Sequence, residues 1–325
     1  MPVIEVSGLT KTFRTYKKQP GFGGALRGLF QREYEPVAAV TGIGFQIEPG
    51  ELVGFLGPNG AGKTTTLKML AGLLYPTAGT AKVLGYVPWE RHDGYRRQFA
   101  LVLGQKNQLW WDLPARESLE LNAKIYGLPT ERFERTVMEM TELLHVRDKL
   151  NVSVRELSLG ERMKMELIAS LLHQPKVLFL DEPTIGLDVV SQKIVREFLC
   201  HYNATHQTTI LLTSHYMADI EALCQRVIII DHGQIFFDGR LGEIVDRFAD
   251  FKHITIHCDG ADACPADGLA KYGEVVEKTP ESVKLKVKRD RVIAACQGLL
   301  DELPVRDIDI EEVPIEEVIR QIFAR

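Results

Sequence analysis

The chain has 325 residues, of which 45% are apolar and 26% are charged, and its formal net charge at pH 7 is −5. The length predicts two domains, or one domain with additions, and the acidic balance argues against a general nucleic-acid-binding protein. No window has the uninterrupted apolar length of a membrane span, and the N-terminus lacks the apolar core of a secretory signal. We therefore expect a chain that does not cross a bilayer by itself.

The first predicted strands are residues 3–6 and 42–48, and in the second strand apolar and polar side chains alternate. Residues 14–36 lie between them and contain basic side chains and glycines, so we interpret them as an inserted loop. A solvated loop is the simpler interpretation, and contact with a membrane surface or a partner is the alternative. Phe13 ends the first predicted element, where an aromatic ring can stack on a planar ligand, with Tyr16 as the rival candidate; either ring can instead pack on a sheet.

The strongest pattern in the chain is the stretch 57–65, which matches the phosphate-binding consensus G-x-x-x-x-G-K-[ST] at every fixed position. The apolar run 52–56 predicts a strand before it, and the spacing of leucines predicts a helix after it. A strand, a glycine loop and a helix N-terminus in this order direct backbone N–H groups at one point, which favours an anion. Lys63 would reach the β- and γ-phosphates, and the Thr64 hydroxyl would ligate Mg²⁺. The loop consists of Gly57, Pro58, Asn59, Gly60, Ala61, Gly62, Lys63, Thr64 and Thr65.

The middle of the chain predicts a block of helices inserted into an alternating strand–helix pattern. The stretch Ser158 to Glu161 opens the last of these helices as an S-x-x-E capping box, which leaves amides and a hydroxyl available for an anion. Before the block we expect strands at residues 81–84 and 99–103 with a helical stretch at 88–98, and within it helices at 114–126, 131–144 and 158–173.

Acidic side chains follow the apolar run 177–181, as expected for a buried parallel strand that delivers carboxylates at its C-terminal end. Asp181 can hold Mg²⁺ through water, and Glu182 can orient and deprotonate an attacking water. A further strand at 208–212 ends just before His215, which places that side chain at the same edge of the sheet. Residues 226–231 and 234–238 predict a closing hairpin.

From about residue 247 the composition changes to that of a small α+β domain. Alternation predicts strands at 253–258, 273–278, 282–288 and 308–310, and apolar stripes predict helices at 292–300 and 315–322. The cysteines are odd in number, scattered and without a C-x-x-C pair, which predicts reduced cytosolic thiols rather than a disulfide framework. The spacing of histidines and cysteines in 253–264 is too irregular to predict a zinc site. The cysteines are Cys200, Cys224, Cys258, Cys264 and Cys296.

With these motifs in order, residues 1 to about 240 resemble the nucleotide-binding subunit of an ATP-binding-cassette (ABC) transporter. The stretch 57–65 corresponds to the Walker A loop, Gln105 to the Q-loop, 157–162 to the signature motif and 177–181 to the Walker B strand. Glu182 follows that strand, Gly186-Leu187-Asp188 corresponds to the D-loop, and His215 to the switch histidine. The tail resembles, less specifically, the C-terminal extension of bacterial drug- and antibiotic-export ATPases of the ABC-2 type.

The signature motif departs from the family pattern L-S-G-G-Q, since Leu159 and Glu161 replace a glycine and the glutamine while Ser158 and Gly160 remain. In the family this motif contacts the γ-phosphate held by the other subunit, so Leu159 adds bulk near that contact. Glu161 adds an acid there unless the capping box occupies it.

The resemblance implies a fold: an α/β P-loop NTPase (RecA-like) core with an N-terminal antiparallel β subdomain, an inserted α-helical subdomain and a small C-terminal α+β domain. We expect an ABC ATPase domain at residues 1–244, with the helical subdomain at about 105–173, and an accessory domain at 245–325. The catalytic residues implied are Glu182, His215, Lys63 and Gln105, with Thr64, Gln105 and Asp181 at the metal. The nucleotide would contact Phe13, the loop 57–65, and Ser158, Gly160 and Asp188.

The function implied is a Mg-dependent ATPase that drives transport, with export favoured, through a separate membrane-spanning permease. Its cofactors are ATP and Mg²⁺, and its partners are the permease and a second copy bound head-to-tail, with no nucleic acid. Its place is the cytoplasmic face of the membrane, as a peripheral protein. The alternative is an ABC ATPase outside transport that acts on nucleic acid or ribosomes, which one cassette and an acidic charge disfavour; a P-loop kinase is disfavoured by the signature motif.

The segment 105–114 links the predicted Q-loop to the helical block and contains Trp110 and Trp111. Adjacent side chains diverge, so we expect at least one of these rings to be exposed. Exposed aromatic rings are typical anchors of protein interfaces, and this segment is our predicted docking site for a cytoplasmic helix of the permease. Packing of both rings against the helical block is the alternative.

Overall fold

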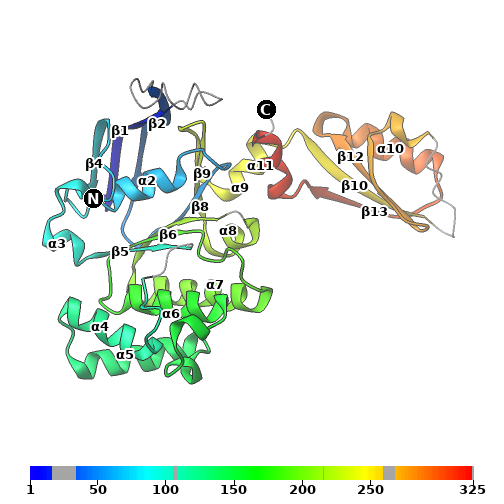
Figure 1. The fold of residues 1–325 in the computed structure, drawn as a ribbon. Helices are drawn as coiled ribbons and strands as arrows, with labels where there is room; N and C mark the ends of the chain where they lie inside the picture. Colours follow the sequence, from blue (N-terminus) through cyan, green and yellow to red (C-terminus); the bar gives the residue numbers. More distant parts are fainter. Residues whose placement is uncertain (17–33, 105–107, 215, 259–267, 324–325) are drawn as a thin grey trace, which may run out of the picture. The chain divides into compact units, whose positions relative to one another are not determined.

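The computed structural model describes residues 1–16, 34–104, 108–214, 216–258 and 268–323 (Figure 1). The chain divides into two compact units, Met1–Gly239 and Arg240–Arg325. The predicted residues Gln105 and His215, the centre of the predicted loop 14–36, and Cys264 lie outside the described residues.

The first unit begins with an antiparallel sheet of strand order β2-β1-β4, which confirms the predicted N-terminal β subdomain. Its strands are β1 (Ile4–Tyr16), β2 (Tyr34–Ile47) and β4 (Ala78–Val83). The prediction of a loop over 14–36 is wrong at both ends, because Arg14 pairs with Pro36 and Tyr16 with Tyr34 in the β1–β2 ladder. Cross-strand pairing therefore extends both strands through basic and polar positions that local alternation did not mark.

The larger sheet of this unit has the order β5-β6-β7-β3-β8-β9. The pairings of β3 with β7 and β8, of β5 with β6, and of β6 with β7 are parallel. Parallel neighbours bring their C-terminal ends to one edge, and that edge carries the loops after β3, β6 and β7. The strands are β3 (Leu52–Leu56), β5 (Phe99–Leu103), β6 (Val177–Asp181), β7 (Thr209–Thr213), β8 (Arg226–Asp231) and β9 (Gln234–Arg240).

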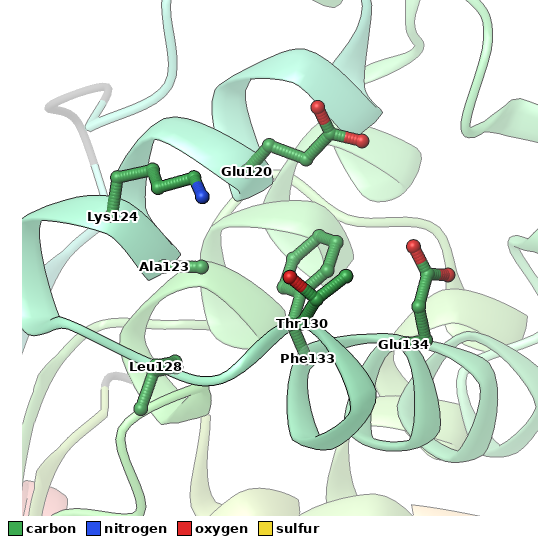
Figure 2. Close-up of a pocket in the computed structure, with 7 residues that line it drawn as sticks. All are labelled: Glu120, Ala123, Lys124, Leu128, Thr130, Phe133 and Glu134. Atoms are coloured by element: carbon green, nitrogen blue, oxygen red, sulfur yellow. The ribbon is translucent and has the colours of Figure 1, made fainter.

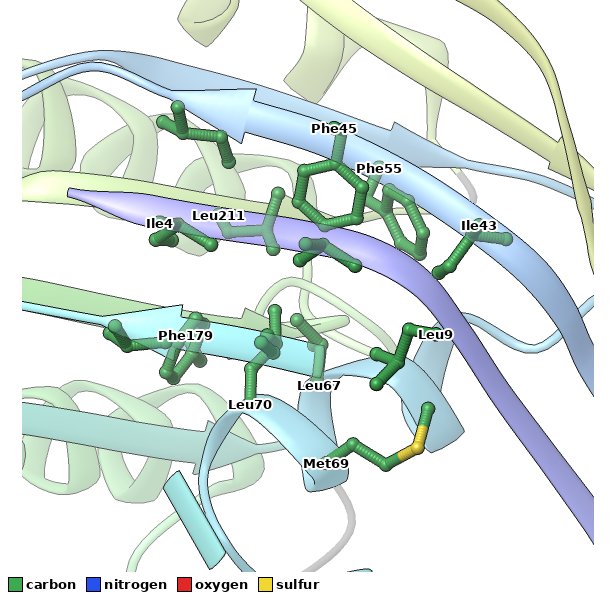
Figure 3. Close-up of a cluster of buried hydrophobic side chains, with 14 of the residues drawn as sticks. Ile4, Leu9, Ile43, Phe45, Phe55, Leu67, Met69, Leu70, Phe179 and Leu211 are labelled. Atoms are coloured by element: carbon green, nitrogen blue, oxygen red, sulfur yellow. The ribbon is translucent and has the colours of Figure 1, made fainter. Parts of the chain in front are cut away.

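The core of this unit lies between the two sheets and helix α2 (Lys63–Leu70). Figure 3 shows Phe45 of β2 beside Phe55 of β3, with Leu67 and Leu70 of α2 facing the same cluster. All four side chains are buried, and the ring centroids of Phe45 and Phe55 are 5.9 Å apart. Burial of the apolar face of α2 fixes the helix that follows the phosphate loop.

The helical block is present, with α4 (Ala115–Tyr126), α5 (Thr130–Leu143) and α6 (Leu159–Leu171) within two residues of the predicted bounds. The predicted helical stretch at 88–98 is present but interrupted: Arg91, with φ +56°, ends a 3₁₀ turn at Pro88–Glu90, and the short helix α3 (Asp93–Arg96) follows. Among the described residues of the unit, the remaining helices are α7 (Val189–His206) and α8 (Met217–Leu223), with short 3₁₀ turns at Arg147–Lys149 and Val154–Glu156.

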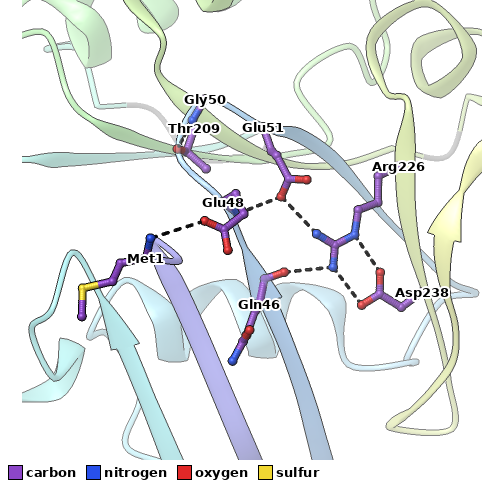
Figure 4. A network of polar contacts seen from close by, with 8 residues as sticks. All are labelled: Met1, Gln46, Glu48, Gly50, Glu51, Thr209, Arg226 and Asp238. Carbon is purple, nitrogen blue, oxygen red and sulfur yellow. Dashed lines mark hydrogen bonds and ion pairs between the residues drawn. The ribbon is translucent and has the colours of Figure 1, made fainter.

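One arginine joins the two sheets of the first unit (Figure 4). The Arg226 guanidinium, on β8, donates to both carboxylate oxygens of Asp238 on β9 at 2.8 and 3.0 Å, and to Glu51 at 3.0 Å. The same group donates to the backbone oxygen of Gln46 on β2 at 2.9 Å. A planar guanidinium with several N–H groups in a fixed fork can make these bonds simultaneously.

The second unit is a four-stranded sheet of order β11-β12-β10-β13 with all pairs antiparallel. Its core is made by the apolar faces of β10 and β12 and the buried residues of α10. The elements are α9 (Leu241–Phe248), β10 (Phe251–Cys258), β11 (Glu274–Lys278), β12 (Ser282–Lys288), α10 (Val292–Glu302), β13 (Val305–Glu312) and α11 (Ile315–Phe323), with 3₁₀ turns at Leu269–Lys271 and Arg289–Arg291.

The cysteine prediction is corrected at one position. Cys200, Cys224 and Cys296 are free, as expected, but Cys258 at the end of β10 is disulfide-bonded. A disulfide requires two cysteines to approach in space, and the linear spacing of the cysteines does not reveal such an approach.

Among the helices of the described residues, none combines the length and the apolar character needed to span a membrane.

Candidate nucleotide-binding site

The loop between β3 and α2 has a backbone that requires glycine. A Cβ on Gly57 would lie 2.2 Å from the backbone oxygen of Ile230, and one on Gly62 would lie 2.5 Å from that of Ala39. Gly62 also has φ +108° and immediately precedes α2, so no side chain covers the first amides of that helix. The loop therefore presents the open N-terminus of a helix, which suits a phosphate.

Lys63 is the first residue of α2, and only 6% of it is exposed. Its Nζ donates to the backbone oxygens of Gly57 at 2.6 Å and Pro58 at 3.0 Å, so the ammonium group lies along its own loop. Burial lowers the pKa of Lys63, while the nearby carboxylates of Glu182 and Asp181 act in the opposite direction. A buried ammonium held by two carbonyls is a preorganised cation for phosphate oxygens.

Each carboxylate oxygen of Asp181, at the end of β6, accepts a hydrogen bond from a threonine hydroxyl. The Thr64 hydroxyl donates to Oδ2 at 2.8 Å, and the Thr213 hydroxyl, at the end of β7, donates to Oδ1 at 2.7 Å. The pair of Thr64 and Asp181 offers two hard oxygen donors side by side, and such donors fit Mg²⁺. Thr213 was not among the predicted site residues, although its place at the end of a strand beside β6 was a usable signal.

Glu182 lies in the left-handed region with φ +56°, between Asp181 and Pro183. Its backbone N–H donates to the backbone oxygen of Thr213 at 3.0 Å and lies 3.1 Å from the Thr213 hydroxyl oxygen. A non-glycine residue in this conformation persists only where its surroundings hold it. The backbone of the proposed catalytic base is thus fixed by the neighbouring strand.

Gly104, which precedes the predicted Gln105, lies against the same backbone. The Gly104 N–H donates to the backbone oxygen of Asp181 at 2.9 Å, and a Cβ on Gly104 would lie 2.5 Å from the backbone oxygen of Glu182. Only glycine fits this approach. A single glycine after a strand carries no specific signal, so Gly104 was not among the predicted site residues.

A buried carboxylate holds the segments next to Glu182 and His215. Asp219 on α8 is fully buried, accepts hydrogen bonds from Thr184 and from Ser214 Oγ at 2.7 Å, and pairs with Arg196 at 2.9 Å. Thr184 comes two positions after Glu182, and Ser214 comes directly before His215. The predicted site omitted this network, since its members come from three separate segments.

Three further predicted residues gather at the N-termini of α6 and α7, and we call Ser158, Gly160 and Asp188 the signature group. Ser158 and Glu161 form the predicted capping box, with N–H to oxygen distances of 3.2 and 2.9 Å. Asp188 caps α7 by accepting from the Ser191 N–H at 2.9 Å, and a Cβ on Gly160 would lie 3.6 Å from the Asp188 carboxylate. The described hydrogen bonds of Ser158 and Asp188 are to their own helices rather than to the phosphate loop.

Leu159 and Phe13 are both partly exposed. Leu159 is 39% exposed and packs beside Gly186, where an added Cβ would lie 3.0 Å from its Cδ2. Phe13, on β1, is 36% exposed, and the Lys11 ammonium lies 5.3 Å from its ring centroid. The Leu159 side chain thus packs against Gly186 of the same chain, where the absence of a Cβ leaves room for it.

The tryptophan loop, defined as residues 108–113, exposes both indoles: Trp110 is 56% and Trp111 45% exposed. This confirms that at least one ring is exposed. Leu121 and Ile125 of α4 are exposed as well. By contrast, a pocket of about 210 Å³ between α4 and α5 is lined by Leu128, Phe133 and charged side chains, and no predicted site residue lines it (Figure 2).

A strand, a glycine loop and a helix that bears a buried lysine, with a carboxylate from a parallel strand bonded to the loop threonine, define a P-loop ATPase. Comparison with known proteins agrees. A family model described as ABC transporter matches residues 40–185, and one described as EvrA-like ABC transporter, C-terminal domain, matches residues 250–311.

Several named proteins are similar to most of this chain. The ABC transporter ATP-binding protein NatA of Bacillus subtilis (strain 168) is 35% identical over 69% of this chain and 92% of that protein. Nod factor export ATP-binding protein I of Burkholderia pseudomallei (strain 1710b) is 35% identical over 78% of this chain and 82% of its own. Linearmycin resistance ATP-binding protein LnrL of Bacillus subtilis (strain 168) is 29% identical over 88% of this chain and 92% of its own.

Among solved structures, an ATP-binding subunit of an ABC transporter matches with a TM-score of 0.62 and 27% identity, over 76% of this chain and 93% of that one. A dimeric cassette bound to ADP and Pi has a TM-score of 0.61 at 21% identity, over 73% of this chain and 98% of that one, which supports the fold alone. The chain therefore belongs to the ABC transporter family, as an ATP-binding subunit with ATPase activity. The predicted fold class and family resemblance are confirmed.

Proposed function

We propose that this chain powers export through a separate membrane-spanning permease, using Mg²⁺ and ATP at a site shared by two copies of the chain. The observation that carries the proposal is the bond between Thr64 and Asp181, which joins the phosphate loop to the strand that presents Glu182. Support for export comes from the relatives named as export and resistance ATP-binding proteins.

The residues of the first unit have distinct roles in the proposed reaction. The amides of residues 57–65 and the Lys63 ammonium bind the phosphates, and Thr64 and Asp181 hold the cation. Bound Mg²⁺ would neutralise charge on the phosphate oxygens. Glu182 accepts a proton from the attacking water, with Gln105 and His215 orienting that water and the γ-phosphate. Phe13 stacks on the base from the exposed end of β1.

The second copy supplies the signature group in this proposal, as the family resemblance implies. Val189 and Val190, which directly follow Asp188, are 77% and 67% exposed, and Leu159 at the start of α6 is exposed as well. Apolar side chains next to a polar group at helix N-termini suit an interface that closes around an anion. Splitting the site in this way makes hydrolysis depend on closure of the pair.

The permease would bind the tryptophan loop and the start of α4. Trp110 and Trp111 provide exposed apolar surface in the loop, and Leu121 and Ile125 are exposed further along α4. A cytoplasmic helix of the permease can lay its apolar face on exposed aromatic residues of this kind. The chain would thereby be held at the cytoplasmic face of the membrane as a peripheral subunit. Nucleic acid is not an expected partner, given the net charge of −5.

The test is co-expression with candidate membrane-spanning permeases from the same organism. We expect the two proteins to co-purify in detergent, and reconstituted vesicles to show ATP-dependent transport that Glu182→Gln abolishes. Glu197→Gln on the exposed side of α7 is the matched control. ATP hydrolysis with neither membrane association nor transport would contradict the proposal and favour the alternative that acts on nucleic acid or ribosomes.

A further inference from the structure

A buried carboxylate on α6 holds the beginning of the tryptophan loop. Glu166 is only 3% exposed, and its oxygens accept the backbone N–H of Gln108 at 2.8 and 3.0 Å and that of Leu109 at 3.2 Å. Burial raises the pKa of Glu166, and the hydrogen bonds from Leu109 and Gln108 oppose that rise. Among the described residues, no ion pair to Glu166 lies within 4 Å, so backbone amides of the loop provide its direct partners.

The choice of a carboxylate at this position has a physical cost, because removing an ionised group from water is unfavourable unless hydrogen bonds replace its hydration. A loop can be fixed to a helix more cheaply by apolar packing alone. Apolar packing lets a helix and a loop slide past each other. Directed hydrogen bonds from a helix side chain to the main-chain amides of a loop do not, so a displacement of the helix also displaces the loop backbone.

A second contact joins the same helix to the same loop one turn nearer the helix start. The Arg162 guanidinium lies 5.1 Å from the ring centroid of Trp111, close enough for a cation–π interaction. Arg162 and Glu166 are four positions apart and so lie on one face of α6. Further contacts of the loop come from other elements. Among them, the Trp110 N–H lies 3.2 Å from Ser118 Oγ on α4, the Arg155 N–H donates to the Trp111 backbone oxygen at 3.0 Å, and the Gln108 side-chain amide donates to the backbone oxygen of Leu101 on β5 at 2.7 Å.

The same helix begins at the signature group. Ser158 caps α6, and Gly160 and Glu161 form its first turn, immediately before Arg162. A helix of this length moves as a rigid body, because its backbone hydrogen bonds resist bending. A shift of its N-terminus therefore reaches both points of contact with the tryptophan loop.

We propose that Arg162 and Glu166 are positioning residues that move the tryptophan loop when the signature group engages nucleotide on a second copy. This inference rests on the proposed function, in which that engagement occurs. The inference names the contacts through which nucleotide binding changes the permease-docking surface. When α6 moves, Glu166 displaces the loop backbone through its hydrogen bonds, and Arg162 displaces the Trp111 ring through the cation–π contact.

The test uses tryptophan emission of the full chain. The tryptophans are Trp89, Trp110 and Trp111, so Trp89→Phe confines emission to the loop, and Glu182→Gln holds the ATP-bound state. Acrylamide quenching is measured without and with Mg-ATP, and the dimer is followed in the same samples by gel filtration. We expect ATP to change the quenching constant in this parent protein.

Glu166→Gln keeps the shape of the side chain but leaves one strong acceptor oxygen in place of a carboxylate. We expect it to dimerise with ATP as the parent does, while the ATP-dependent change in quenching falls below half. Glu197→Gln, an exposed glutamate on α7, should retain the full change. If Glu166→Gln does not fold, Arg162→Gln tests the second contact, and we again expect the quenching change to fall below half in the protein that still dimerises.

The outcomes separate the two proposals. A parent that dimerises with ATP but shows no change in quenching overturns the link and leaves the proposed function intact. A full change in Glu166→Gln or Arg162→Gln, with the dimer formed, overturns it as well. A parent that binds ATP without dimerising contradicts the shared site, and the link with it.

Discussion

The Thr64 hydroxyl donates a hydrogen bond to Asp181 Oδ2 at 2.8 Å, although the two residues are 117 positions apart in the chain. The strand order accounts for the meeting. The strand before Thr64, β3, and the strand that ends in Asp181, β6, both neighbour β7 in the sheet. The end of β7 contributes Thr213, which takes the other oxygen of the same carboxylate. The carboxylate at the end of β6 is thus held from two sides, by a hydroxyl on α2 and by a hydroxyl at the end of β7.

Replacing Lys63 with alanine removes the only side-chain charge that the phosphate loop itself contributes. We expect ATP hydrolysis to fall by at least a hundredfold, because loss of one preorganised charge contact in a phosphoryl-transfer site costs roughly 3 kcal/mol. Steady-state release of phosphate by the purified variant measures the effect, with Lys68→Ala on the same helix as the control. Turnover near that of the control would refute the assigned role.

Glu182→Gln keeps the size of the side chain and removes the base. We expect ATP binding to persist, hydrolysis to stop, and a closed dimer to accumulate with ATP, because the product state that opens the pair is not formed. Gel filtration with Mg-ATP measures the dimer, and phosphate release measures turnover. A variant that stays monomeric and still hydrolyses ATP would contradict the role of this glutamate.

Thr213→Val leaves Asp181 Oδ1 without its hydroxyl donor and removes the hydroxyl that lies beside the Glu182 N–H. A hydrogen bond to a charged group contributes about 1.5 kcal/mol or more, so we expect hydrolysis to fall at least about tenfold. Thr213→Ser, which keeps the hydroxyl, is the matched control and should lose far less. Equal activities of the two variants would contradict the role assigned to the Thr213 hydroxyl.

Deleting residues 245–325 should leave a cassette that still binds ATP. The chain divides at Gly239 and Arg240, and the strands and helices that carry the predicted nucleotide residues lie in the first unit. The rise in melting temperature caused by Mg-ATP measures binding in the truncated and full-length proteins. A truncated protein that does not fold, with or without nucleotide, would show that the second unit is part of the core of the first.

Replacing Trp110 and Trp111 together with alanine removes two exposed rings from the proposed docking surface. We expect weaker co-purification with the permease and less transport, because exposed aromatic side chains at an interface centre contribute much of its binding energy. Tyr75→Ala, an exposed aromatic residue outside this loop, is the control. Undiminished assembly and transport would move the docking surface elsewhere, and residues 14–36 become the next candidate.

The phosphate loop, the acidic strand end and the helical block were predictable from the sequence because their patterns are local. Residues 57–65 match a consensus, β6 is a continuous apolar run, and α4, α5 and α6 show helical spacing over more than ten residues each. Local pattern determined even the capping box at Ser158, since both of its partners lie within one turn.

The residues that sequence reasoning missed act through pairing across the fold. Arg14 and Pro36 belong to strands only because they pair with each other. Thr213 gains its role from β6 in the sheet, and Glu166 from a loop 57 positions earlier. Nothing in the neighbouring sequence of Arg14, Pro36 or Glu166 indicates such partners, whereas the place of Thr213 at a strand end was a usable signal. The prediction of a reduced thiol at Cys258 was wrong for the same reason, because a disulfide depends on which cysteines approach each other in space.

Arg226 limits how this part of the chain can change during evolution. Its guanidinium serves Asp238, Glu51 and the Gln46 backbone together. Lysine would keep the charge but not the planar fork, so its compact ammonium group could not reproduce this set of hydrogen bonds. Substitutions at position 226 should therefore be accepted mainly in chains where positions 51 and 238 have also changed. We expect these three positions to covary among sequences related to this one.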